Sequence, residues 1–328
     1  MDRRYLDALR DRVLFFDGGM GTQVQARELN AADFGGKRWE GCLDYLSVTR
    51  PDVVEDIHTA YFEAGADVIE TNSFQASAVR FAEWDLGERT REINHAAAAI
   101  ARRVADRFQK TDGRPRFVAG SMGPSGMLPS SEDPDLGRLG LDELIPAFAE
   151  QAHGLVEGGV DLLILETCQD MLEMKAQILA CREVFARTGR IVPIQCSVTL
   201  DPTGRMLLGT DIRGALATLE AMAVDVIGLN CSTGPDLMRD SIRYLCANAG
   251  TPVHCIPNAG LPINDGGRTV YPMKPAPMAE TLHEFVRDLG VNIVGGCCGT
   301  TPAHIEAIAA AVGSLPPRRM PAPAPYTR

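Results

Sequence analysis

The stretch Val224-Asp-Val-Ile-Gly-Leu-Asn-Cys231 is a short apolar run that ends in polar and thiol side chains. Further runs of this kind recur along the chain, at residues 13–17, 66–72, 116–121, 160–166, 191–198, 252–258 and 291–297. Continuous apolar runs without polar alternation are typical of strands that are buried on both faces of a parallel sheet. The sequence therefore predicts eight such strands.

Helical patterns fill the intervals between these runs. Residues 51–65 carry apolar side chains at helical spacing, and Pro51 suits a first turn as Gly65 suits a stop. Further helices are expected at 93–108, 143–157, 171–188, 212–221, 236–248 and 276–289. Eight strands that alternate with helices over roughly 300 residues predict an α/β fold of the (β/α)8 TIM-barrel type.

A doubly wound open sheet is the alternative architecture. It normally carries a G-x-G-x-x-G turn after an early strand, whereas Asp17-Gly-Gly-Met-Gly-Thr22 is rich in glycine but lacks that spacing. We therefore expect one barrel domain over residues 1–314. The proline-rich residues 315–328 have the composition of a semi-rigid linker, which suggests that the barrel is one module of something longer.

Composition excludes several classes of protein. The chain has 328 residues, with 32 Lys and Arg against 43 Asp and Glu, so its net charge is −11. An acidic chain without a basic run is a poor binder of nucleic acid. No apolar segment reaches the ~18–20 residues that span a bilayer. Nine scattered cysteines without a recognisable export signal favour free thiols or metal ligands in a reducing, cytoplasmic compartment.

Thiol groups stand where two of the runs end, which is the functional face of a barrel. Cys231 ends the sixth run, and Cys297 and Cys298 end the eighth, so one strand separates them. Adjacent cysteines can reach one metal only at an irregular strand end, and the flanking glycines would permit such a bend. Three sulfurs suit Zn²⁺ with a fourth position open for substrate. Buried, inert thiols and a redox-active vicinal disulfide are the alternatives.

Asp17 and Glu166 also stand at strand ends. A pair of carboxylates in a barrel mouth could serve as the acid and the nucleophile of a glycosidase. The same pair could instead bind the ammonium group of a substrate. Gly18 and Gly19 follow Asp17 and would let backbone N–H groups approach a ligand carboxylate. The residues alone leave these alternatives open.

Several segments together resemble the homocysteine S-methyltransferase family. They are Asp17–Thr22 and the residues 64–74, 120–124, 228–232, 257–260 and 294–302, and the Gly-Gly-Cys-Cys-Gly element in the last is the most specific. The match runs from about residue 10 to residue 312. Residues 39–52 are most similar to the N-terminal homocysteine-binding module of cobalamin-dependent methionine synthases.

The resemblance implies a set of site residues. Zn²⁺ would be held by Cys231, Cys297 and Cys298, and Asn258 would fill an exchangeable fourth position until the homocysteine sulfur replaces it. The implied substrate residues are Asp17 and Glu166 for the amino group, and Gly18, Gly19, Thr71 and Ser121 for the carboxylate. No further catalytic residue is expected, because the metal itself deprotonates the thiol.

The resemblance also implies a methyl donor and partner modules. The donor would be methylcobalamin carried on a separate module, with folate- and cobalamin-binding modules in the same longer protein or in a partner chain. A free-standing enzyme that uses S-methylmethionine or betaine is the alternative, and Gln75 stands where the betaine enzymes carry a tyrosine. A metal- or thiol-binding barrel without turnover is a more distant alternative.

Overall fold

The computed structural model describes residues 2–318, and it contains the eight predicted strands in one parallel sheet of order β1-β10-β7-β6-β5-β4-β3-β2. A bridge between Phe16 and Val68 joins the two edges, so the sheet closes into a (β/α)8 barrel. The strands are β1 (Leu14–Phe15), β2 (Val68–Glu70), β3 (Phe117–Met122), β4 (Leu162–Cys168), β5 (Ile194–Val198), β6 (Val226–Asn230), β7 (Val253–Ile256) and β10 (Ile293–Val294).

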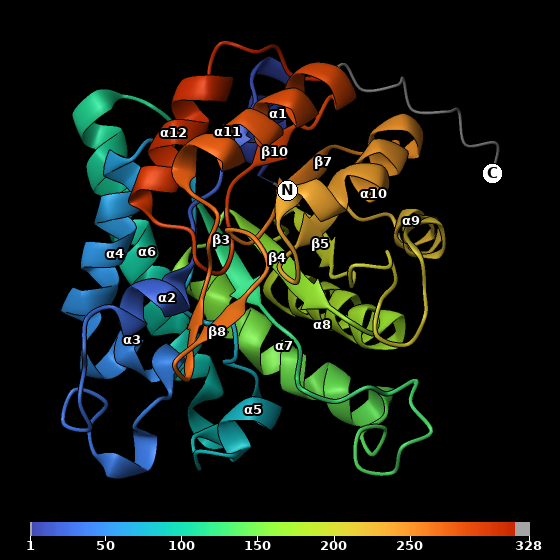
Figure 1. Ribbon diagram of the computed structural model, residues 1–328. Helices are drawn as coiled ribbons and strands as arrows, with labels where there is room; N and C mark the ends of the chain where they lie inside the picture. Colours follow the sequence, from blue (N-terminus) through green and yellow to red (C-terminus); the bar gives the residue numbers. More distant parts are fainter. Residues whose placement is uncertain (1, 319–328) are drawn as a thin grey trace.

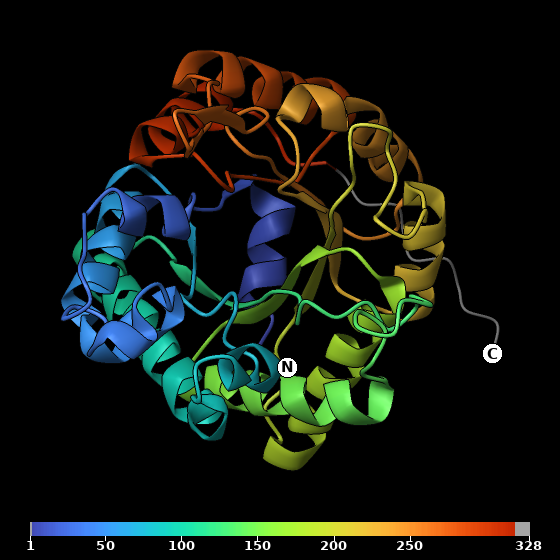
Figure 2. The same cartoon turned by 60° about the horizontal axis from the view of Figure 1, so that its bottom comes forward.

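Helices surround this barrel as a ring (Figure 2). The predicted helices are confirmed as α4 (Pro51–Glu63), α6 (Thr90–Asp112), α7 (Leu141–Gly158), α8 (Met171–Thr188), α9 (Ile212–Ala221), α10 (Pro235–Asn248) and α11 (Pro275–Glu284). The helix expected over 276–289 is α-helical only up to Glu284. Its last five residues, Phe285–Leu289, form a π-helical turn. Proline in the first turn fixes the starts of α4, α10 and α11.

The sequence patterns did not predict several elements (Figure 1). They are α1 (Arg4–Asp11), α2 (Met20–Gln25), α3 (Leu46–Thr49), α5 (Ala78–Ala82), α12 (Pro302–Val312), and a hairpin of β8 (Ile263–Asp265) and β9 (Arg268–Val270). Short 3₁₀ turns lie at Lys37–Trp39, Leu43–Tyr45 and Gly87–Arg89. Over residues 2–318, no helix is both long and apolar enough to cross a membrane.

Helix α1 closes the barrel at the end where the strands begin, and Figure 2 shows it in the centre of the ring. Its Tyr5 and Leu9 are buried in the barrel interior with strand residues such as Phe117. The Tyr5 hydroxyl donates to Gln195 Oε1 of β5 at 2.6 Å. This helix therefore completes the interior core at that end of the barrel.

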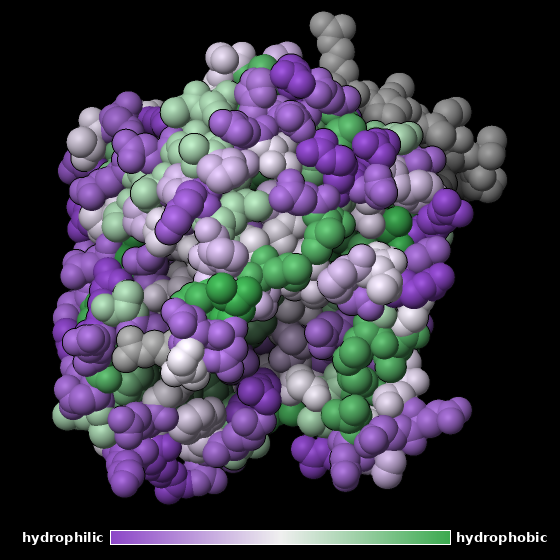
Figure 3. Space-filling model, in the orientation of Figure 1, coloured by the Kyte–Doolittle hydropathy of each residue, from purple (hydrophilic) through white to green (hydrophobic). Residues whose placement is uncertain are grey.

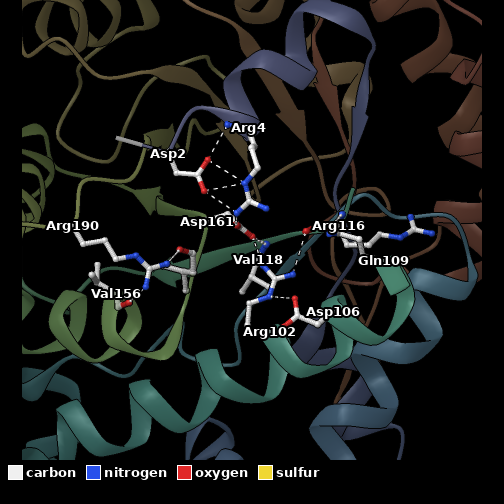
Figure 4. Close-up of polar contacts among 11 residues, drawn as sticks. Asp2, Arg4, Arg102, Asp106, Gln109, Arg116, Val118, Val156, Asp161 and Arg190 are labelled. Atoms are coloured by element: carbon white, nitrogen blue, oxygen red, sulfur yellow. Dashed lines mark hydrogen bonds and ion pairs between the residues drawn. The ribbon is translucent and has the colours of Figure 1, made fainter. Parts of the chain in front are cut away.

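A polar network ties the same end together (Figure 4). Asp161, which precedes β4, accepts from Arg102 at 2.7 Å, from Arg4 at 3.2 Å and from the Val118 N–H at 2.8 Å. Because Arg4 belongs to α1 and Arg102 to α6, the carboxylate links the closing helix to the outer ring. The strand starts thus form a closed face, which leaves the strand ends as the open face.

The structure describes the predicted linker, residues 315–328, only as far as Arg318; the rest of it lies outside the described residues. Arg318 donates to the carbonyl oxygens of Ala249 at 3.1 Å and Thr251 at 2.7 Å. Thr251 lies just before β7, so the chain reaches residue 318 at the strand-start face.

Candidate functional site

The three cysteines meet at the open end of the barrel. Cys231 follows β6, and Cys297 and Cys298 follow β10, with β7 between the two strands. The three sulfur atoms lie within 4.8 Å of one another, and the Sγ of Cys298 is 3.9 Å from that of Cys231 and 4.0 Å from that of Cys297. Zn–S bonds of about 2.3 Å in a tetrahedron place sulfurs about 3.8 Å apart. The observed separations fit that geometry.

Unusual backbone conformations bring the sulfurs together. Cys231 and Ser232 adopt left-handed φ values of 60° and 58°, which end β6 abruptly and turn the thiol into the mouth. Gly299 has φ of 78°, and a Cβ there would lie 2.2 Å from the Tyr271 side chain. Only glycine fits this turn after the cysteine pair. The Cys297 N–H donates to the carbonyl oxygen of Pro257 at 2.8 Å, which fixes the turn to the loop after β7.

The thiols titrate as one group. Hydrogen bonds with Cys231 and Cys297 lower the pKa of Cys298 to about 3, and a hydrogen bond with Cys231 raises the pKa of Cys297. One negative charge is therefore centred on Cys298 while the other sulfurs retain protons. A divalent cation would favour the thiolate at all three positions, because a coordinated thiol is deprotonated. The donor set therefore suits a soft, divalent metal such as Zn²⁺.

Asn258 lies beside this cluster and is buried. Its side-chain Oδ1 accepts from the Cys298 N–H at 3.1 Å. An amide oxygen has two lone pairs, so it can keep this bond and still face a metal. The structure therefore brings the expected fourth residue to the cysteines, with its oxygen held toward Cys298.

Asp17 and Glu166 are buried at the same end of the barrel, and each accepts hydrogen bonds. Asp17 Oδ2 accepts from the Glu70 N–H at 3.0 Å. Glu166 accepts from Ser121 Oγ at 2.6 Å and from Asn230 Nδ2 at 3.1 Å. Burial raises the pKa of Asp17 well above its usual range and that of Glu166 to about 7. No lysine, arginine or histidine in residues 2–318 forms an ion pair with either carboxylate.

The remaining expected residues line the same mouth but already have partners within the protein. Thr71 Oγ1 accepts from the Ser121 N–H at 2.9 Å. The Gly19 N–H donates to Thr300 Oγ1 at 3.0 Å. A Cβ at Gly18 would lie 2.6 Å from that same Thr300 oxygen, so the chain after β1 packs tightly against the loop that carries the cysteine pair. The two glycines thus connect the carboxylate side of the mouth to the thiol side.

A family model described as homocysteine S-methyltransferase matches residues 14–312, nearly the whole described chain. The chain belongs to the homocysteine S-methyltransferase family. It is therefore a methyltransferase, and its family membership displaces the glycosidase alternative for Asp17 and Glu166.

Curated relatives point the same way. The chain is 46% identical over 314 residues to a methionine synthase of Mycobacterium tuberculosis, and 45% identical over 311 residues to a methionine synthase of Mycobacterium leprae. The alignments cover 96% and 95% of this chain but 26% and 25% of the two relatives. The chain therefore corresponds to about a quarter of each relative.

Solved structures agree on the fold. The chain matches a homocysteine methyltransferase of Escherichia coli in its oxidized form with a TM-score of 0.74 and in its metallated form with a TM-score of 0.73. Both matches have 25% sequence identity and cover 94% of this chain, with 98% and 99% of the other chain. A metallated state of such a neighbour is consistent with the metal site expected here.

Within this methyltransferase barrel, sequence reasoning missed two residues at strand ends, Asn230 and Glu70. Asn230 Nδ2 donates to Glu166 and lies 4.0 Å from the Cys297 sulfur, so it joins the carboxylate to the thiols. Its Oδ1 accepts from Ser197 Oγ at 2.7 Å, deeper in the barrel. Each residue stands near the end of a predicted run, directly before a residue that was selected (Cys231 or Thr71), and this position was the available clue.

Proposed function

We propose that this chain transfers a methyl group to the thiolate of L-homocysteine, with Zn²⁺ held by Cys231, Cys297 and Cys298, and gives methionine. The observation that carries the proposal is the meeting of three sulfurs from two distant segments at separations that suit one tetrahedral ion. Bound zinc supplies a thiolate at neutral pH from a thiol whose ordinary pKa is about 8.5. The position near Asn258 would be the one that the homocysteine sulfur takes.

The chain's own residues would hold the amino acid end of the substrate. Asp17 and Glu166 are buried acceptors without a cationic partner in the described part of the chain, so a substrate ammonium group would complete them. Gly18, Gly19, Thr71 and Ser121 line the same mouth and would position the substrate carboxylate. The Asn230 side chain fixes Glu166 and approaches Cys297, and so it sets the distance between the ammonium and sulfur sites.

We propose methylcobalamin as the donor, presented by another module at the mouth. Six of the seven large apolar side chains that are exposed in residues 2–318 follow strand ends; they are Leu136, Leu207, Leu208, Leu237, Leu261 and Ile263. Figure 3 shows apolar side chains gathered around a hollow on this face. An exposed apolar rim is typical of a protein docking surface. The relatives are about four times as long as the match, which leaves room for folate- and cobalamin-binding modules.

This proposal keeps the domain division expected from the sequence, with a barrel over residues 1–314 and a linker over 315–328. All nine cysteines are free, which supports a reducing, cytoplasmic location. A free-standing enzyme that uses S-methylmethionine or betaine is the second candidate. It is favoured by the match to nearly the full length of the Escherichia coli homocysteine methyltransferase, since a barrel of this size is there a whole chain.

The test is methyl transfer to homocysteine by the zinc-loaded chain with each donor supplied separately. Methionine formed from methylcobalamin alone supports the proposed subtype. Methionine formed only from S-methylmethionine or betaine supports the second candidate. A chain that binds homocysteine but gives no methionine with any donor contradicts both.

A further inference from the structure

We infer that Glu70 is a third carboxylate of the ammonium pocket, and that it makes the site selective for thiols with a free, unsubstituted amino group. The inference rests on the proposed function, because it concerns the same substrate. It adds a residue that neither the sequence patterns nor the family resemblance assigned to the site.

The strand direction places Glu70 in the barrel mouth. On β2, Val68 packs in the barrel interior and Ile69 packs in the outer core beneath the helices. Side chains alternate along a strand, so Glu70 points to the interior at the strand's open end. Because β2 lies between β1 and β3, Glu70 stands between the end of β1, where Asp17 follows, and Ala119 of β3, two residues before Ser121. Its own N–H donates to Asp17 Oδ2 at 3.0 Å, which fixes the two residues together.

The Glu70 carboxyl group is incompletely bonded. The residue is partly exposed at the mouth, but its Oε1 is buried and has no hydrogen-bond partner in residues 2–318. A buried oxygen of this kind is costly unless something bonds it. A ligand that donates an N–H from the mouth would supply the missing bond.

Charge identifies that ligand as a cation. Burial and the negative charges of Glu166 and Asp17 raise the pKa of Glu70 well above its usual range. None of the three carboxylates has an ion pair with a basic residue in the part of the chain that the structure describes. A primary ammonium group has three N–H donors in tetrahedral arrangement. Three surrounding carboxyl groups, from β1, β2 and β4, can accept one each.

The position of Glu70 favours the ammonium group over the thiol. The Cys298 charge contributes to the raised pKa of Glu166, whereas the charges that act on Glu70 are those of Glu166 and Asp17. Glu70 is thus coupled to the two carboxylates that are assigned to the ammonium group, and its N–H binds one of them, Asp17. A site that surrounds an ammonium group with acceptors rejects analogues without it, because its buried polar atoms would stay unpaired. The ligand class is therefore α-amino thiols, and deaminated and N-acylated thiols are excluded.

The experiment compares binding of homocysteine and of 4-mercaptobutanoate, its analogue without the amino group, to the zinc-loaded chain by calorimetry. Glu70→Gln should raise the Kd for homocysteine at least about tenfold, since it removes a charge-assisted bond. The Kd for 4-mercaptobutanoate should stay unchanged, because this ligand has no ammonium group to donate to residue 70. Glu70→Asp, which withdraws the carboxylate but keeps its charge, should weaken homocysteine binding less.

The matched control is Glu173→Gln on α8. Glu173 is also buried, with a pKa raised by burial to about 7, but its carboxylate already accepts from the Ser125 N–H at 2.8 Å. This variant should leave the ratio of the two Kd values unchanged. Equal weakening of both ligands by Glu70→Gln, or no weakening of either, overturns the inference while the proposed function stands. Failure of the unaltered zinc-loaded chain to bind homocysteine overturns the proposed function and this inference together.

Discussion

Buried carboxylates at the two ends of the barrel have different partners. At the strand starts, Asp161 pairs with Arg4 at 3.2 Å and with Arg102 at 2.7 Å (Figure 4). Asp67, just before β2, pairs with Arg12 and with Arg114, each at 2.6 Å. Burial raises the pKa of Asp161, and the Arg102 charge opposes that rise. The two carboxylates at this end are therefore neutralised within the fold and contribute to its stability.

At the strand ends, Asp17 and Glu166 are buried without an arginine or lysine among their partners in residues 2–318. Their hydrogen bonds come from neutral groups such as Ser121 and Asn230. An uncompensated buried charge weakens a fold unless a ligand neutralises it. The difference between the ends supports the proposal that the carboxylates at the strand ends bind a cationic group of the substrate.

The largest expected effect is on the thiol cluster. Cys298→Ala should abolish zinc binding and lower methyl transfer to homocysteine at least about 10³-fold, because two cysteines would no longer hold the ion that activates the substrate thiol. Zinc content and initial rate check this. Cys246→Ala, a partly exposed thiol at the other end of the barrel, is the control and should retain both. An active, zinc-free Cys298→Ala protein would contradict the account.

The next largest effect is on stability at the closed end. Asp161→Ala should lower the free energy of unfolding by about 2–3 kcal/mol, because it leaves the buried Val118 N–H without its acceptor and removes the ion pair with Arg102. Denaturant unfolding measures the change. The KM for homocysteine should stay the same, since Asp161 is at the far end of the strands. A raised KM for homocysteine with an unchanged free energy of unfolding would contradict the assignment of the strand-start carboxylates to stability.

The same comparison predicts the opposite outcome for Glu166→Gln. Homocysteine binding should weaken by about 10–100-fold, as expected for a lost charge-assisted bond in a buried site. The free energy of unfolding of the ligand-free chain should not fall, because the variant removes an unpaired buried charge. Calorimetric titration and denaturant unfolding of one preparation give both values. Strong destabilisation without a change in affinity would assign Glu166 to the structural core.

The smallest effect is a pH dependence. Burial raises the pKa of Glu166 from 4.5 to about 7, so between these values the folded chain holds a proton that the unfolded chain has lost. Stability therefore falls as pH rises through this window. Denaturant midpoints of the metal-free chain at pH 5 and pH 8 should differ less in Glu166→Gln than in the unaltered chain. An identical difference in both proteins would show that other groups cause the slope.

The sequence predicted the barrel because its eight strands are buried on both faces and their apolar runs are unbroken. It missed α1 because that helix is short and mostly polar, and only Tyr5 and Leu9 among its residues are fully buried. The role of α1 depends on strands far along the chain. The hairpin β8–β9 was missed because it lies inside one long loop and its β8 residues are exposed.

The sequence also predicted that Cys231 lies close to Cys297 and Cys298, since strand order in a barrel follows chain order. The same reasoning could not choose Glu70 or Asn230. Their importance depends on which face of a strand each side chain occupies and on what lies opposite it. Those facts depend on register and closure, such as the bridge between Phe16 and Val68, which no local pattern encodes.

The central claim is that three cysteine sulfurs hold one zinc ion with a fourth position for the substrate sulfur. X-ray absorption at the zinc edge, with and without homocysteine, tests it most directly. We predict about one zinc per chain, with three sulfurs and one lighter atom that change to four sulfurs when homocysteine is added. A spectrum that does not change with homocysteine, or a chain that binds no zinc, would contradict the account.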